Sequence, residues 1–260
     1  MTLWFHDLSA LCYLAAAILG WTGLRSGRTL PWLLGAGVLF QAIGFIGFHT
    51  LVPPVSLESS AGGLSLMGWL AASAYLLSLG FARTQAVSGW VAAAAFCFTG
   101  GAALELRLLG PTPVVIGGTG AWPHAHILLA AAGFSALAVA SVAGLGYLLK
   151  ERALKSKRGR GVELPSLESL DRLGYLGLAI GFPLLTLGVI TGFGWVQAQG
   201  SSLWTRHATL SLIAWIVYFV PVASRLVQGR RGRGTARFLV FGFLVLALSY
   251  LGSQVVELGS

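Results

Sequence analysis

Charged residues are scarce in this sequence: Asp, Glu, Lys and Arg make up 10% of its 260 residues. An ordinary soluble domain carries about 25%. A water-soluble fold of this length could not cover its surface with so few charges, which excludes a soluble enzyme or binding domain. Hydrophobic residues make up 56% of the chain, and several apolar runs reach the roughly 20 residues that cross a bilayer as a helix. The sequence predicts an all-α integral membrane protein, a bundle of about eight transmembrane helices in a single membrane domain.

Cysteine is nearly absent as well. Cys12 and Cys97 both lie in apolar runs, and no C-x-x-C pair occurs. A membrane thiol–disulfide carrier needs two reactive thiols within reach of each other, so this class is disfavoured. Both cysteines are expected to be small core residues.

Turn residues and charges divide the chain into eight apolar segments. The predicted spans are 4–24, 30–52, 64–82, 88–106, 123–148, 172–196, 207–227 and 236–256. The first segment lacks a basic start and a small-residue cleavage site, so it is expected to be a retained span rather than a signal peptide. The longest inner connection is a basic loop at 149–171.

Lysine and arginine set the predicted orientation. With the amino terminus outside, fifteen of them lie at inner helix ends or loops, and only Arg107 and Arg206 lie outside. The positive-inside rule therefore places both termini on the extracytoplasmic side. A net charge of +9 can indicate nucleic-acid binding, but these cations flank the spans and lack interleaved aromatics. The expected partner is the anionic inner leaflet of the lipid bilayer, with no nucleic acid.

Glycine is abundant, with 36 residues. Gly177, Gly181, Gly188 and Gly192 recur at spacings of four and seven within one apolar span. Small residues at such spacing let two membrane helices approach closely. The sequence therefore predicts a tight helix contact along this face.

The five histidines all fall at the predicted outer ends of spans. They are His6, His49, His124, His126 and His207. A neutral imidazole is a metal ligand, and the positive end of a helix dipole disfavours its protonation. The alternative is that these rings occupy the interfacial belt without a cofactor. His124 and His126 are two positions apart, so on a helix at most one of them faces a given ligand.

Aromatic and basic residues share this outer level. Trp122, Trp195 and Trp204 could wall a pocket for a flat apolar group such as heme. Arg206, next to His207, could pair with a carboxylate, or it could extend to the interface without a ligand. Glu105 and Arg107 could be mutual neighbours. A zinc site has less support, because no carboxylate or thiolate accompanies the histidines.

Three stretches of the carboxyl-terminal half carry a family resemblance. The first is Trp122-Pro-His-Ala-His126, at the start of a helix. The second runs from Gly192-Phe-Gly-Trp195 through Trp204 to His207-Ala-Thr-Leu-Ser. The third combines Arg231-Gly-Arg233, Gly242-Phe-Leu and Tyr250-Leu-Gly252. Together they resemble the cytochrome c assembly membrane-protein family, which includes the CcsA and CcmC heme handlers. In length and layout the chain is most similar to the YpjD/HemX-like branch.

The resemblance implies a heme-binding or heme-handling protein that assists c-type cytochrome biogenesis. It implies multi-pass insertion in the bacterial cytoplasmic membrane and other biogenesis membrane proteins as partners. His126 matches the family's external heme ligand, His207 would be the second axial ligand to the iron, and His49 would be the reserve.

Two departures from the family pattern argue against cytochrome c synthase activity, and no catalytic residue is predicted. The family's tryptophan-rich external loop is reduced to Trp195, Gly200 and Trp204 without its aspartate, and no histidine lies near the carboxyl end. The alternative function is that of a cofactor-free, HemX-like regulator or scaffold acting through the basic loop at 149–171.

Overall fold

The computed structural model of the protein describes residues 3–22, 29–48, 51, 55, 59–79, 87–111, 121–156, 164–198, 206–229 and 231–258. Within these ranges only the backbone is described for residues 121–123, 198, 206–207 and 251–258.

The described residues form eight α-helices and no strand. The helices are α1 (Trp4–Thr22), α2 (Thr29–Phe48), α3 (Ser60–Ser78), α4 (Ser88–Leu108), α5 (Ala121–Lys155), α6 (Leu167–Ala198), α7 (Arg206–Gln228) and α8 (Arg233–Leu258). This confirms the predicted all-α fold. Helices α2 to α8 are each long and apolar enough to cross a membrane, and the chain is a multi-pass membrane protein.

The helix ends differ from the predicted spans in the basic region. Helix α5 continues to Lys155 rather than stopping at 148, and α6 starts at Leu167 rather than at 172. Hydropathy detects only the part of a helix that lies in hydrocarbon, whereas the helix itself can continue into polar surroundings. The predicted loop at 149–171 is therefore helical at both of its ends.

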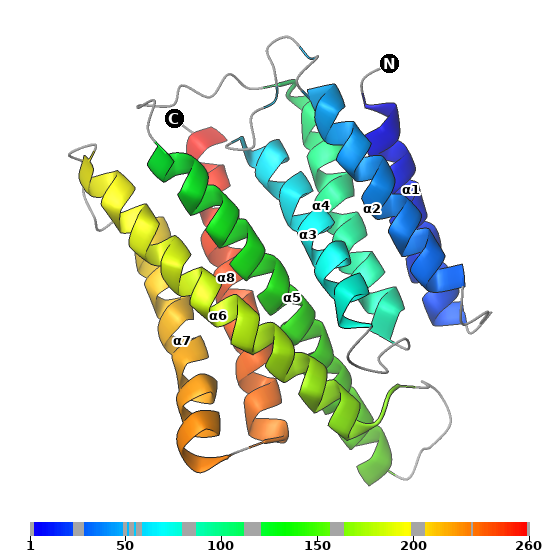
Figure 1. Ribbon diagram of the computed structural model, residues 1–260, viewed down its shortest axis with the longest axis vertical. Helices are drawn as coiled ribbons and strands as arrows, with labels where there is room; N and C mark the ends of the chain where they lie inside the picture. The colour runs from blue at the N-terminus through cyan, green and yellow to red at the C-terminus, as the bar shows by residue number, and fades with distance from the viewer. Residues whose placement is uncertain are drawn as a thin grey trace. The chain divides into compact units, whose positions relative to one another are not determined.

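The chain divides into two compact units, residues 1–116 and 117–260. In the first unit, α1 packs on α2 and α4, and α3 packs on the same two helices. These four helices form a bundle (Figure 1). Helices α1 and α4 approach closely at Gly20 and Gly89, where a Cβ on Gly20 would lie 2.6 Å from the Gly89 Cα.

A chain of polar side chains crosses the interior of the first unit. Gln41 is fully buried, and its amide bonds to groups on three other helices, α1, α3 and α4. His6 is fully buried as well, with Nε2 2.8 Å from the Ser65 hydroxyl. Since buried polar groups need partners, this network fixes how the four helices pair.

The second unit repeats the bundle arrangement with α5 to α8. Helix α5 packs on α6 and α8, and α7 packs on the same two helices, so α5 and α7 are diagonal to each other. The predicted glycine contact is confirmed along α5 and α6. A Cβ on Gly177 would lie 2.7 Å from the Ala136 carbonyl oxygen, and one on Gly181 would lie 2.7 Å from Leu137.

A carboxylate joins three helices of the second unit. Asp171 of α6 accepts two hydrogen bonds from the Arg225 guanidinium of α7, at 3.0 and 3.3 Å. It also accepts one at 3.2 Å from the backbone N–H of Gly232, just before α8. The side chains are only 15% and 11% exposed. The Arg225 guanidinium also lies 4.1 Å from the centre of the Tyr175 ring.

We expect Asp171→Ala to lower the free energy of unfolding by about 3 kcal/mol, because it leaves a buried guanidinium without its anion. The measurement is reversible unfolding of the purified protein in mixed micelles. Lys155→Ala is the control, since its ion pair with Glu151 is exposed and surface ion pairs contribute little to stability. Equal losses in both variants would contradict the prediction.

Candidate functional site

His126 lies in the second turn of α5, against the last turns of α6. Its Nδ1 is 2.8 Å from the carbonyl oxygen of Gly188. A Cβ on Gly192 would lie 2.8 Å from the His126 Cε1 and 2.9 Å from Nδ1. The imidazole therefore occupies space that only a glycine at position 192 leaves open. The glycine face of α6, which fits small residues of α5 along most of its length, receives a histidine ring at this end.

The hydrogen bond to Gly188 determines which ring nitrogen carries the proton. A carbonyl oxygen can only accept, so Nδ1 is the donor and holds the hydrogen. In the neutral ring the lone pair is then on Nε2. Histidines that bind a metal through one nitrogen are commonly oriented by such a bond at the other. His126 thus has the tautomer and the fixed orientation of a metal ligand.

Trp195 completes the described part of this site. Its ring centre is 6.2 Å from that of His126, and the two planes are tilted by 38°. The indole Nε1 is buried and has no hydrogen-bond acceptor among the described residues. A buried N–H without an acceptor is costly, and a carboxylate or another acceptor on a bound group would satisfy it.

The other predicted site residues divide into three groups. His124 has an exposed side chain, unlike the half-buried His126, as expected for residues two apart on a helix. Trp122, Arg206 and His207 belong to helices whose backbone is described there without side chains, and His49 and Trp204 lie outside the described residues.

The register between α6 and α7 gives the level of position 207. The Trp215 Nε1 of α7 donates to the Thr186 hydroxyl of α6 at 2.9 Å. Helices α6 and α7 are antiparallel, and neither has a proline between this contact and the end of the unit where His126 lies. Eight residues from Trp215 toward that end is position 207, and eight residues from Thr186 is position 194, so these two positions are level. His126 contacts residue 192. The starts of α5 and α7 therefore lie at the same depth in the second unit.

The predicted pairing of Glu105 with Arg107 is wrong. Arg107 forms a 2.6 Å ion pair with Asp7 of α1, and Glu105 accepts a hydrogen bond from Ser60 of α3. Two residues apart on α4, these side chains point to different neighbours. No three His, Cys, Asp or Glu side chains converge within the described ranges, so a metal held by this part of the chain would need further ligands.

Comparison with known proteins supports the resemblance. The family model described as "Cytochrome C assembly protein" matches residues 39–259. The chain is 31% identical over 182 residues to the cytochrome c biogenesis protein CcsA of Synechococcus sp. (strain CC9902), covering 60% of each chain. It is 29% identical over 227 residues to CcsA of Synechocystis sp. (strain ATCC 27184 / PCC 6803 / Kazusa), covering 84% of this chain and 66% of that one.

A 28.8 kDa protein of Azospirillum brasilense, encoded in a nifR3-like 5′ region, is 31% identical over 202 residues, which is 75% of this chain and 74% of that protein. The chain thus spans about three fifths of the length of the first CcsA relatives and a larger share of the shorter one. Because the family model matches well over half of the chain, from within α2 to the end of α8, the chain belongs to the cytochrome c assembly protein family.

Proposed function

We propose that this protein binds heme at the outer end of its second helical unit and assists the biogenesis of c-type cytochromes. The observation that carries the proposal is the fixed imidazole of His126, with its Nδ1 proton donated to Gly188. A heme iron takes an axial nitrogen ligand of this kind. When bound, the heme supplies the iron, and the residues of the chain hold and orient it.

The described side chains fit such a group in two further respects. The buried indole N–H of Trp195 lacks an acceptor among the described residues, and a propionate carboxylate is a strong acceptor. Trp195 also supplies an aromatic face beside the imidazole. Both features suit a flat apolar ring with an acidic edge.

His207 is the proposed second ligand. It is level with the site by the register of α6 and α7, and it starts the helix diagonal to α5. Two helices of one bundle could in this way supply ligands to a group held at this end of the second unit. Arg206 would serve a propionate, with Trp122 and Trp204 as further walls.

The role in biogenesis is proposed from the family. Two of its CcsA relatives are named for cytochrome c biogenesis, and the chain spans only part of them. We propose that it positions heme in the bacterial cytoplasmic membrane for partner proteins of the pathway. The reduced tryptophan loop favours handling over covalent attachment.

The test is the absorption spectrum of the full chain, purified in detergent and supplied with heme. We expect the wild-type protein to show a Soret band. His126→Ala should abolish this band or lower the heme affinity at least tenfold, because it removes a ligand of the iron. His124→Ala is the matched control, because its exposed ring is two positions away. A spectrum without heme absorbance in the wild type, or one equal in both variants, would refute heme binding at this site and favour the cofactor-free regulator.

A further inference from the structure

A basic cavity lies at the opposite end of the second unit from His126. It is lined by Leu148, Glu151, Arg152 and Lys155 of α5 and by Arg233 and Arg237 of α8. Its volume is about 370 Å³. Four cations and one carboxylate give it a net charge of +3.

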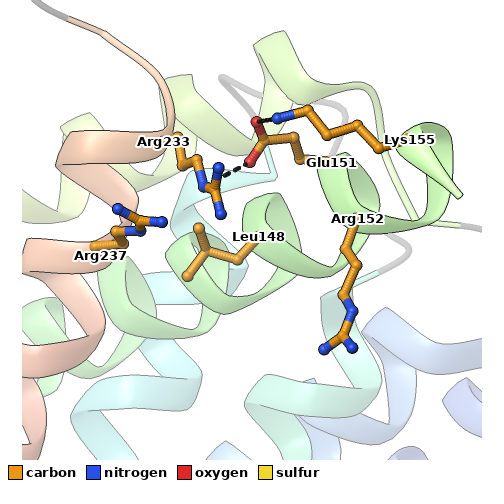
Figure 2. Close-up of a pocket in the computed structure, with 6 residues that line it drawn as sticks. All are labelled: Leu148, Glu151, Arg152, Lys155, Arg233 and Arg237. Atoms are coloured by element: carbon orange, nitrogen blue, oxygen red, sulfur yellow. Dashed lines mark hydrogen bonds and ion pairs between the residues drawn. The ribbon is translucent and has the colours of Figure 1, made fainter.

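The single carboxylate is already engaged by two of the cations. Lys155 lies 2.7 Å and Arg233 3.4 Å from opposite oxygens of Glu151. Arg237 lies on the next turn of α8, and the side chain of Arg152 extends away from Glu151 (Figure 2). Neither Arg152 nor Arg237 forms an ion pair within the part of the chain that the structure describes. The cavity thus has an excess of guanidinium donors and no further anion of its own.

Guanidinium groups in such an arrangement match the oxygens of a phosphate group. A phosphate could come from a soluble anion or from a lipid headgroup, and the surroundings favour the lipid. Leu148 lines the cavity itself. An exposed apolar stripe runs along α8 from the cavity toward the membrane interior, through Phe238, Phe241, Leu244 and Leu248. An amphiphile with an anionic head and an apolar tail fits both features at once.

We propose that this cavity is a binding site for the headgroup of an anionic phospholipid, with an acyl chain along α8. The site is independent of heme binding, because its residues are confined to the basic ends of α5 and α8. Basic pockets between membrane helices hold such headgroups on the inner side of a membrane, which is where the positive-inside rule puts this end. Bound lipid would join α5 to α8 through a shared anion.

The experiment measures lipid binding to the purified full chain by native mass spectrometry and by thermal stabilisation in neutral detergent. The probes are cardiolipin, phosphatidylglycerol and phosphatidylcholine, with glycerol 3-phosphate and inorganic phosphate as soluble arms. We expect both anionic lipids to bind at least fivefold more tightly than phosphatidylcholine, and the soluble phosphates to stabilise the protein far less. Equal binding of phosphatidylcholine overturns the proposal. Soluble phosphates as effective as the lipids also overturn it, since they would show a free-anion site.

Charge variants locate the site. Removing one cation near a lipid surface weakens binding about fivefold, so R233Q/R237Q should weaken anionic-lipid binding about 25-fold. Glu151→Gln, which removes the competing carboxylate, should strengthen it. Arg231→Gln is the control for each single charge removed, because Arg231 lies just before α8 and does not line the cavity. Unchanged lipid binding in the double variant, or an equal loss in Arg231→Gln, contradicts the assignment.

Discussion

Gly192→Ala is expected to lower heme affinity about 10- to 100-fold, the usual cost of disturbing a group that orients a metal ligand. The added methyl group would lie 2.8 Å from Cε1 and 2.9 Å from Nδ1 of His126. Real side chains do not approach so closely, so the ring must rotate away. Rotation breaks the hydrogen bond from Nδ1 to Gly188. Without this bond the ring no longer favours the tautomer that has its proton on Nδ1 and its lone pair on Nε2.

The same substitution should leave the stability of the protein almost unchanged. Alanine is a better helix former than glycine by about 1 kcal/mol, which offsets the roughly 1 kcal/mol lost with the hydrogen bond of the imidazole. Loss of heme affinity without loss of thermal stability would therefore separate an orienting role for Gly192 from a purely structural one.

Heme titration followed in the Soret region, with thermal unfolding of the heme-free protein alongside, measures both effects. Gly234→Ala is the matched control, because a Cβ at that position of α8 meets nothing within 4 Å. If Gly192→Ala binds heme as the wild type does, the fixed orientation of His126 is not what makes it a ligand.

The number and order of the helices could be predicted because bilayer thickness imposes a minimum length on each apolar run. The ends of α5 and α6 could not, because the polar turns beyond the membrane carry no hydropathy signal. The segment from Leu148 to Lys155, for example, is an amphipathic part of α5 beside α8. Where this segment ends depends on how α5 packs rather than on the thickness of the bilayer.

The candidate site was predictable only in part. The glycine face of α6 and the histidines of α5 are both visible in the sequence. That His126 lies on Gly192 follows from the antiparallel register of the two helices, in which Gly181 meets Leu137 and Gly188 meets Ala130. In each of these three pairs the two residue numbers add up to 318, so the glycine spacing could have indicated His126 once α5 was chosen as the partner.

The polar network of the first unit was missed entirely. Single polar residues such as Gln41 and Ser65 are inconspicuous within apolar spans, and helical periodicity cannot tell which spans pair. The sequence predicts His6 at the outer end of the first span, but it does not predict that the ring is buried. In the structure His6 lies in the first turn of α1, fully buried between Ser65 and Phe48, whose ring centre is 4.6 Å away.

Gln41→Leu should destabilise the first unit by about 2–4 kcal/mol, because one substitution removes the partners of several buried groups. The Gln41 amide nitrogen donates to the Ser65 carbonyl and Thr99 hydroxyl at 2.9 Å and lies 3.1 Å from the Ser65 hydroxyl. Its oxygen accepts from Tyr13 at 3.0 Å and from Ser9 at 3.3 Å. Leucine has a similar volume, so the loss comes from unsatisfied hydrogen-bonding groups rather than from a cavity.

A second substitution distinguishes that cause from poor packing. Replacing both members of a buried pair by apolar groups is nearly neutral, whereas replacing one leaves the other without a partner. Thr99→Val in the Gln41→Leu background should therefore recover about 1 kcal/mol, although alone it destabilises the protein. Unfolding in mixed micelles gives the three free energies, with exposed Gln228→Leu as the control for composition. If the two losses add in the double variant, the shape of the side chains, and not hydrogen bonding, decides how these four helices pair within the apolar membrane.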